Sequence, residues 1–122
     1  QNKVKIFKGW QSEKMEAKLL SISDIVWIAY KNYSTPSGVL YQAASYGLPV
    51  IVSNDGLINK LNKKYKFGIS INTNNLKSSV KEINNLLILS KYRNYSQNIK
   101  KFYNTARPDS WVKGFSNVID KF

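Results

Sequence analysis

The residues best suited to chemistry lie in one short loop. Thr35-Pro36-Ser37-Gly38 places hydroxyls, a proline and a glycine directly before a segment with helical spacing. A helix start presents backbone N–H groups and a partial positive charge, and Gly38 has no side chain to keep an anion away. The loop therefore predicts a phosphate site, and ordinary helix capping is the alternative.

Two apolar runs flank this loop and its helix. Residues 25–29 (IVWIA) and 48–52 (LPVIV) have the composition of strands that are covered on both faces. Between them, apolar residues recur at helical spacing over 38–46, and Gly47 stands where a helix needs a residue with positive φ to end. This order predicts a βαβ unit with two parallel strands and a right-handed crossover.

Polar loops follow both predicted strands. Tyr33 and Ser34 lie in the loop after the first strand, and the turn Ser53-Asn54-Asp55-Gly56 follows the second. Open parallel sheets bind ligands beyond the carboxyl ends of their strands. We therefore expect both loops at one edge of the sheet, next to the start of the helix.

The rest of the chain predicts further strands and helices. Short strands are expected at 4–7 and 67–71, and one or two helical turns between 57 and 66. The remaining helices are expected at 12–22, 75–89, 91–105 and from about 110 to 122. Their apolar stripes are, in that order, Met15, Leu19 and Ile22; Leu76, Val80, Ile83 and Leu87; Tyr92, Tyr95, Ile99 and Phe102; and Trp111, Phe115, Val118 and Phe122.

This order of elements predicts an α/β fold with a small parallel sheet in a single domain, 1–122. Residues 1–90 form the α/β core in this interpretation, and residues 91–122 form the carboxyl-terminal helices. The length of 122 residues fits one domain with a modest core.

Composition excludes several kinds of site. The chain has no cysteine and no histidine, so histidine-assisted nucleophiles and thiolate or imidazole metal sites are ruled out. The net charge of +12 favours anionic partners. Nucleic acid is the less favoured of these, because the tyrosines of segment 91–105 lie on its core-facing stripe and are not exposed for stacking.

A family resemblance rests on one stretch above all. Gln42-Ala43-Ala44-Ser45-Tyr46-Gly47-Leu48-Pro49-Val50 resembles the E-A-x-A-x-G-x-P-V pattern of the carboxyl-terminal, nucleotide-sugar-binding domain of GT-B glycosyltransferases, the glycosyl transferases group 1 kind. Phe7-Lys8-Gly9, Asp24 and Phe67-Gly68-Ile69 resemble shorter family signatures, and Trp111 resembles an aromatic residue common near the end. The resemblance implies a Rossmann-like, three-layer α/β/α arrangement.

The resemblance also implies where a donor would bind. By position, the diphosphate falls on Ser37, Gly38, Val39 and Leu40, and the ribose or sugar on Gln42, Ser34 and Tyr33. Asn54, Asp55 and Gly56 form a further loop on the donor side. The two family glutamates are Ser34 and Gln42 here, and a later one is Asn59. No catalytic residue is assigned.

The function expected from this resemblance is transfer of a sugar from a nucleoside-diphosphate donor to a glycan or lipid acceptor, with retention of configuration. No metal and no other cofactor is expected. The acceptor would be bound by an amino-terminal domain outside this chain, so the 122 residues alone are expected to be inactive. We expect a cytoplasmic location, and peripheral contact with the inner face of a membrane stays open. The alternatives are a non-catalytic nucleotide-binding domain, which the missing carboxylates favour, and a basic nucleic-acid-binding domain.

Overall fold

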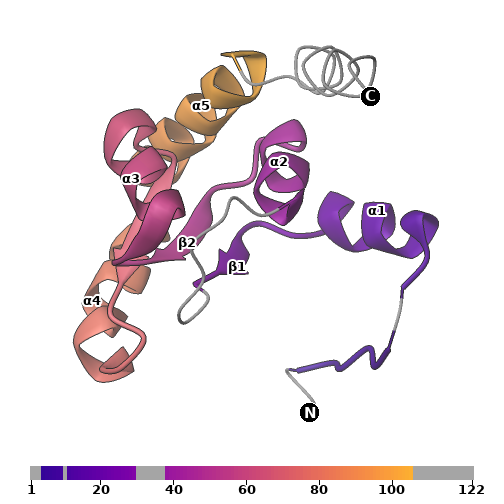
Figure 1. Ribbon diagram of the computed structural model, residues 1–122, viewed down its shortest axis with the longest axis horizontal. Helices are drawn as coiled ribbons and strands as arrows, with labels where there is room; N and C mark the ends of the chain where they lie inside the picture. The colour runs from indigo at the N-terminus through magenta and orange to yellow at the C-terminus, as the bar shows by residue number, and fades with distance from the viewer. Residues whose placement is uncertain (1–3, 10, 30–37, 106–122) are drawn as a thin grey trace, which may run out of the picture.

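Three short parallel strands form the centre of the protein (Figure 1). The computed structural model describes residues 4–9, 11–29 and 38–105. In chain order its elements are α1 (Glu13–Ser21), β1 (Val26–Ile28), α2 (Gly38–Ser45), β2 (Val50–Ser53), α3 (Gly56–Tyr65), β3 (Gly68–Ile71), α4 (Leu76–Leu86) and α5 (Leu89–Thr105).

The sheet has the order β1-β2-β3, and both pairs of neighbours run parallel. Val26 is opposite Val50, and Val50 is in turn opposite Gly68. The predicted βαβ unit is therefore confirmed. The carboxyl ends of all three strands meet at one edge of the sheet, which we call the carboxyl edge.

Helices cover both faces of the sheet, as a three-layer Rossmann-like α/β arrangement requires. On one face, Ile28, Val50 and Val52 belong to a buried cluster to which α2, α3 and the end of α5 contribute. On the other face, Ile51 and Ile69 pack with Leu86 of α4. Successive side chains of β2 point to opposite faces of the sheet. Because helices cover both faces, every residue of this strand is buried.

The helix of the central unit ends where the sequence predicts. Leu40, Ala43 and Ala44 form its buried face. Gly47 has φ of +67°, and its N–H donates to the carbonyl of Ala44 at 3.0 Å. The positive φ favours glycine at position 47, and a side chain there would also displace the flexible aliphatic stem of Lys100.

Helix α3 is longer than expected, with ten residues in place of one or two turns. Two buried asparagines hold it to β3. Asn62 donates from Nδ2 to the carbonyl of Gly68 at 2.9 Å, and its Oδ1 accepts from the N–H of Phe67 at 3.0 Å. Asn59 accepts from the hydroxyl of Ser70 at 2.7 Å. The interior side of α3 is partly polar, so counting apolar residues alone underestimates its length.

Helix α5 crosses the amino-terminal edge of the sheet, where the strands begin. Tyr92 donates its hydroxyl to the carbonyl of Asp24 at 2.7 Å, just before β1. Ser96 donates to the carbonyl of Gly47 at 2.7 Å, before β2, and Asn98 to the carbonyl of Lys66 at 2.8 Å, before β3. Three side chains of one helix therefore fix the entry to all three strands. The predicted inward stripe of 91–105 is confirmed, because Ile99 and Phe102 are buried.

Two expectations for the amino-terminal part are wrong. Residues 4–7 form no strand: they pair with no neighbour in the sheet, and Val4 and Ile6 are exposed. The predicted face of the first helix is not core either, since α1 has no buried residue and Ile22 is 71% exposed. Both errors have the same cause: the pattern of apolar residues does not show whether a neighbouring element covers them.

Two expectations about burial are also wrong. In α4 the predicted stripe is mostly on the surface: Leu76, Val80 and Leu87 are exposed, and the buried residues are Ser79 and Leu86. The other error is in β1, which is not covered on both faces, because Trp27 is 48% exposed. The apolar residues of α4 follow a helical pattern and those of β1 form an apolar run. Such patterns predict the type of element, but they do not show which of its faces other elements cover.

The helix expected from about 110 to 122, with Trp111 and Phe115, lies outside the described residues. Within 4–9, 11–29 and 38–105, no helix is both long enough and apolar enough to cross a bilayer.

Candidate functional site

The carboxyl edge carries the start of α2, where the sequence predicts a phosphate site. The helix begins at Gly38, which is exposed. An added Cβ at this position would meet no described atom within 4 Å. An exposed backbone at the positive end of a helix is physically suited to an anion.

The next two residues differ in what they offer. Val39 is half-buried, and Leu40 is fully buried in the core. The side chain of Leu40 fixes α2 against the sheet, so Leu40 can contribute to a ligand only through its backbone. The surrounding core thus holds the start of the helix in one position.

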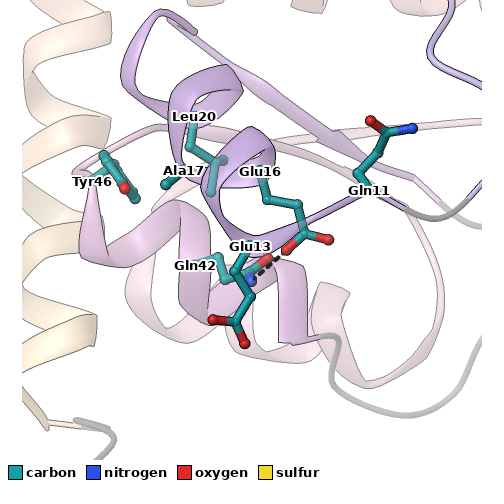
Figure 2. Close-up of a pocket in the computed structure, with 7 residues that line it drawn as sticks. All are labelled: Gln11, Glu13, Glu16, Ala17, Leu20, Gln42 and Tyr46. Atoms are coloured by element: carbon teal, nitrogen blue, oxygen red, sulfur yellow. Dashed lines mark hydrogen bonds between the residues drawn. The ribbon is translucent and has the colours of Figure 1, made fainter.

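A cavity of about 470 Å³ lies between α1 and α2, beside the predicted ribose residue (Figure 2). Gln42 and Tyr46 reach it from α2. The residues that line it from the α1 side are Gln11, Glu13, Glu16, Ala17 and Leu20. Its lining mixes apolar side chains with carboxylates and amides, which is typical of a pocket that takes a polar ligand.

Gln42 and Glu16 form the central contact of this cavity. The Nε2 of Gln42 donates to Oε2 of Glu16 at 3.5 Å, a long hydrogen bond. Figure 2 shows the carboxylate of Glu13 directed away from this contact. Ser12 fixes the first turn of α1, because its hydroxyl accepts from the N–H of Met15 at 3.1 Å. The glutamates also sit where the helix macrodipole favours negative charge.

The turn Asn54-Asp55-Gly56 follows β2 at the same edge of the sheet. Asn54 and Asp55 are exposed, and the side chain of Asp55 makes no capping hydrogen bond. The turn itself is held by Asn59, whose Nδ2 donates to the carbonyl of Asn54 at 2.9 Å. These residues do not line the cavity between α1 and α2. Asn59, which stands at a family glutamate position, is committed to the fold.

The structure places part of the predicted site. Gly38 begins α2 and is exposed, and Gln42 lines the cavity between α1 and α2. Tyr33, Ser34 and Ser37 lie outside the described residues.

Sequence reasoning missed the cavity residues of the α1 side and Tyr46. Glu13 and Glu16 had a visible signal, because carboxylates three apart share one side of a helix. That signal was explained by the macrodipole alone. Nothing local indicates that this side of α1 faces Gln42, which comes 26 residues after Glu16.

The described residues contain no group of three or more histidine, cysteine, aspartate or glutamate side chains that would hold a metal ion. The polar groups of the cavity are carboxylates, amides and a phenol. Such groups recognise hydroxyls and N–H donors through hydrogen bonds.

Comparison with known protein families gives one match. The family model described as "Glycosyl transferases group 1" matches residues 1–102, which is most of the chain. No curated protein and no solved structure matches the chain significantly.

Proposed function

Because the chain belongs to the glycosyl transferases group 1 family, we propose that it binds the nucleoside-diphosphate sugar from which the enzyme transfers a sugar. The observation that carries the proposal is the exposed start of α2 at Gly38, on the carboxyl edge of a parallel sheet. The cavity between α1 and α2 lies farther along the same helix, where Gln42, one turn after Gly38, lines it.

The diphosphate would lie at the start of α2, against the backbone of residues 37–40. Gly38 allows close approach, and the helix end stabilises the negative charge that develops on the leaving diphosphate. Asn54 and Asp55, at the same edge, would contact the donor from the next strand. Tyr33 and Ser34 remain proposed neighbours of the sugar.

The ribose would be bound by Glu16 and Gln42 together. The family glutamate at position 42 is glutamine here, so this position supplies no carboxylate. Glu16 supplies one from α1, and the amide of Gln42 orients it across the cavity. A carboxylate accepts hydrogen bonds from two vicinal hydroxyls, while the amide oxygen of Gln42 accepts another. The negative charge of the site would therefore come from Glu16 on α1 and not from position 42 on α2.

The acceptor would be a glycan or a lipid, bound by a second domain of a longer protein, with retention of configuration and without a metal. Two features of the structure support a missing neighbour. Within the described residues, β1 pairs with β2 alone, and Trp27 beside it is half-exposed. An open strand edge next to an exposed tryptophan is a surface that proteins usually cover.

Calorimetric titration with uridine and guanosine diphosphate tests the donor site. Gly38→Ala places a methyl group where the diphosphate approaches, and Glu16→Gln removes the proposed ribose acceptor. We expect each to weaken binding by about tenfold or more. Gly38→Ala does so by keeping the diphosphate away from the backbone, and Glu16→Gln because a hydrogen bond to a charged group contributes about 1.5 kcal/mol or more. Glu82→Gln, which changes an exposed glutamate of α4, is the matched control and should bind like the wild type.

Equal binding by all four proteins would refute the proposed site. Tight binding without sugar transfer by the full-length enzyme would instead support the alternative of a non-catalytic nucleotide-binding domain. This alternative is supported by the replacement of both family glutamates, at positions 34 and 42.

A further inference from the structure

Positive charge is concentrated at the end of the molecule opposite the carboxyl edge. α3, α5 and the residue after α3 carry seven lysines and one arginine, and residues 56–66 and 89–105 contain no acid. All eight side chains are exposed: Lys60, Lys63, Lys64, Lys66, Lys91, Arg93, Lys100 and Lys101. Apart from Lys60, which lies earlier in α3, we call this set the basic pole.

Contacts between α3 and α5 join the basic residues at the end of α3 to the second half of α5. The ring of Tyr65 meets that of Phe102 edge-on at 5.0 Å between centroids, and Lys64 lies over Tyr65 at 5.2 Å. Asn98 is hydrogen-bonded to the backbone of Lys66. The charges at the end of α3 therefore lie on a helix next to the one that carries Lys100 and Lys101, as the ribbons of α3 and α5 show (Figure 1). Lys91 and Arg93 lie about two turns earlier on α5, toward the start of β1.

An apolar turn adjoins this surface. Leu87 and Ile88 connect α4 to α5, Leu89 begins α5, and these three residues are 62%, 47% and 60% exposed, in that order. Leu87 and Tyr92 line a small cavity with Asp24, so this turn also lies at the amino-terminal edge. Three consecutive exposed aliphatic residues are unusual on a surface that faces only water.

We propose that the basic pole and the apolar turn dock the protein on an anionic membrane surface. Lysine and arginine side chains are attracted to acidic headgroups, and aliphatic side chains enter the boundary between headgroups and acyl chains. The turn sits two residues before Lys91 and four before Arg93, so both kinds of contact are available at one place.

The same features favour a bilayer over a nucleic acid. Binding of single strands uses exposed aromatic rings for stacking. The rings of α5 point inward instead: Phe102 is buried, and Tyr92, Tyr95 and Tyr103 are half-buried. Lysine outnumbers arginine, and lysine acts as a point charge without the planar fork that suits base edges. Exposed aliphatic residues add nothing to phosphate binding.

This docking would leave the carboxyl edge directed to the aqueous phase, from which a nucleotide donor arrives, an orientation that rests on the proposed donor site. The docking itself is measured without any nucleotide. Failure of vesicle binding and failure of nucleotide binding are therefore separate results.

The test is sedimentation of the protein with phosphatidylcholine vesicles, with and without phosphatidylglycerol. We expect binding only with the anionic lipid and weakening with salt. Lys100→Glu with Lys101→Glu should weaken binding by at least about 25-fold, since each basic residue near the surface contributes about fivefold. The matched control is Lys77→Glu with Lys81→Glu, which makes the same charge change at exposed positions of α4. It should lose far less.

A second pair of variants tests the apolar turn. Ile88→Ser with Leu89→Ser should weaken vesicle binding by about tenfold or more, because burying each aliphatic side chain is favourable by about that factor. Leu76→Ser with Val80→Ser changes two exposed aliphatic residues of α4 and is the control. Circular dichroism of all variants should match the wild type, since every substituted side chain is exposed.

Four results would overturn the proposal. The first is equal sedimentation with neutral and anionic vesicles, and the second is an equal loss in a test pair and its control. The third is tighter binding to single-stranded RNA than to anionic vesicles, which would assign the basic pole to a nucleic acid. The fourth is a wild-type dimer that does not bind vesicles and that the Ile88/Leu89 variant abolishes, which would assign the turn to a self-interface.

Discussion

Replacing Gln42 by glutamate, the residue that the family carries at this position, should destabilise this protein. The new carboxylate would stand where the amide Nε2 now lies, 3.5 Å from Oε2 of Glu16. Two unit charges at this distance repel by about 1 kcal/mol in a water-like medium, and the lost hydrogen bond adds about 1 kcal/mol. We use the water-like value because Gln42 is exposed. The free energy of unfolding should therefore fall by about 2 kcal/mol.

The exchange of both residues provides the control. Glu16→Gln combined with Gln42→Glu keeps the net charge and restores one amide facing one carboxylate. Urea unfolding of the wild type, both single variants and the double variant gives the coupling energy, which we expect near 2 kcal/mol. Added salt should reduce the repulsive part. Wild-type stability of Gln42→Glu, or a double variant no more stable than the sum of the singles, would refute the pairing.

Three further predictions concern the fold. Gly68→Ala should destabilise the protein by about 3 kcal/mol in urea unfolding, because the added Cβ would run into the backbone carbonyl of Val50 on β2. Leu86→Ala should cost about 3 kcal/mol and Leu87→Ala less than about 0.5 kcal/mol, because only Leu86 is buried; equal costs would contradict the assignment of the α4 core face. Burial, together with the nearby Asp24 carboxylate, raises the pKa of Tyr92 above 10.0. The neutral phenol therefore stabilises the fold below about pH 10. Below that pH, the free energy of unfolding of the wild type should exceed that of Tyr92→Phe by about 1 kcal/mol. This difference should decline as the pH rises further, and a difference that stays constant would contradict the prediction.

Local signals were sufficient for the central βαβ unit. Two apolar runs, a helix of buried alanines between them and Gly47 at its end specify strand, helix and strand within 30 residues. Each signal depends on contacts near in sequence, and the parallel pairing follows from the crossover rule. The start of the helix near Gly38 was predicted for the same reason.

The features that the sequence did not reveal depend on distant contacts. Which face of α4 is buried depends on where β3 and α5 lie, since Leu86 and Leu87 are equally apolar. The meeting of Glu16 with Gln42 depends on the packing of α1 on α2. The composition of residues 4–7 predicts a strand. A strand forms only beside a partner with free hydrogen-bonding groups, and in the structure these residues pair with no strand of the sheet.

The most direct test of the donor site is a titration of the isotope-labelled protein with uridine and guanosine diphosphate, followed through its backbone and side-chain amide signals. The account predicts that one of the two nucleotides shifts the backbone amide of Gly38 and the side-chain amide of Gln42, while Ser96 and Asn98, at the amino-terminal edge, stay unchanged. Unmoved signals at Gly38 and Gln42 under saturating nucleotide, or shifts confined to the amino-terminal edge, would contradict it.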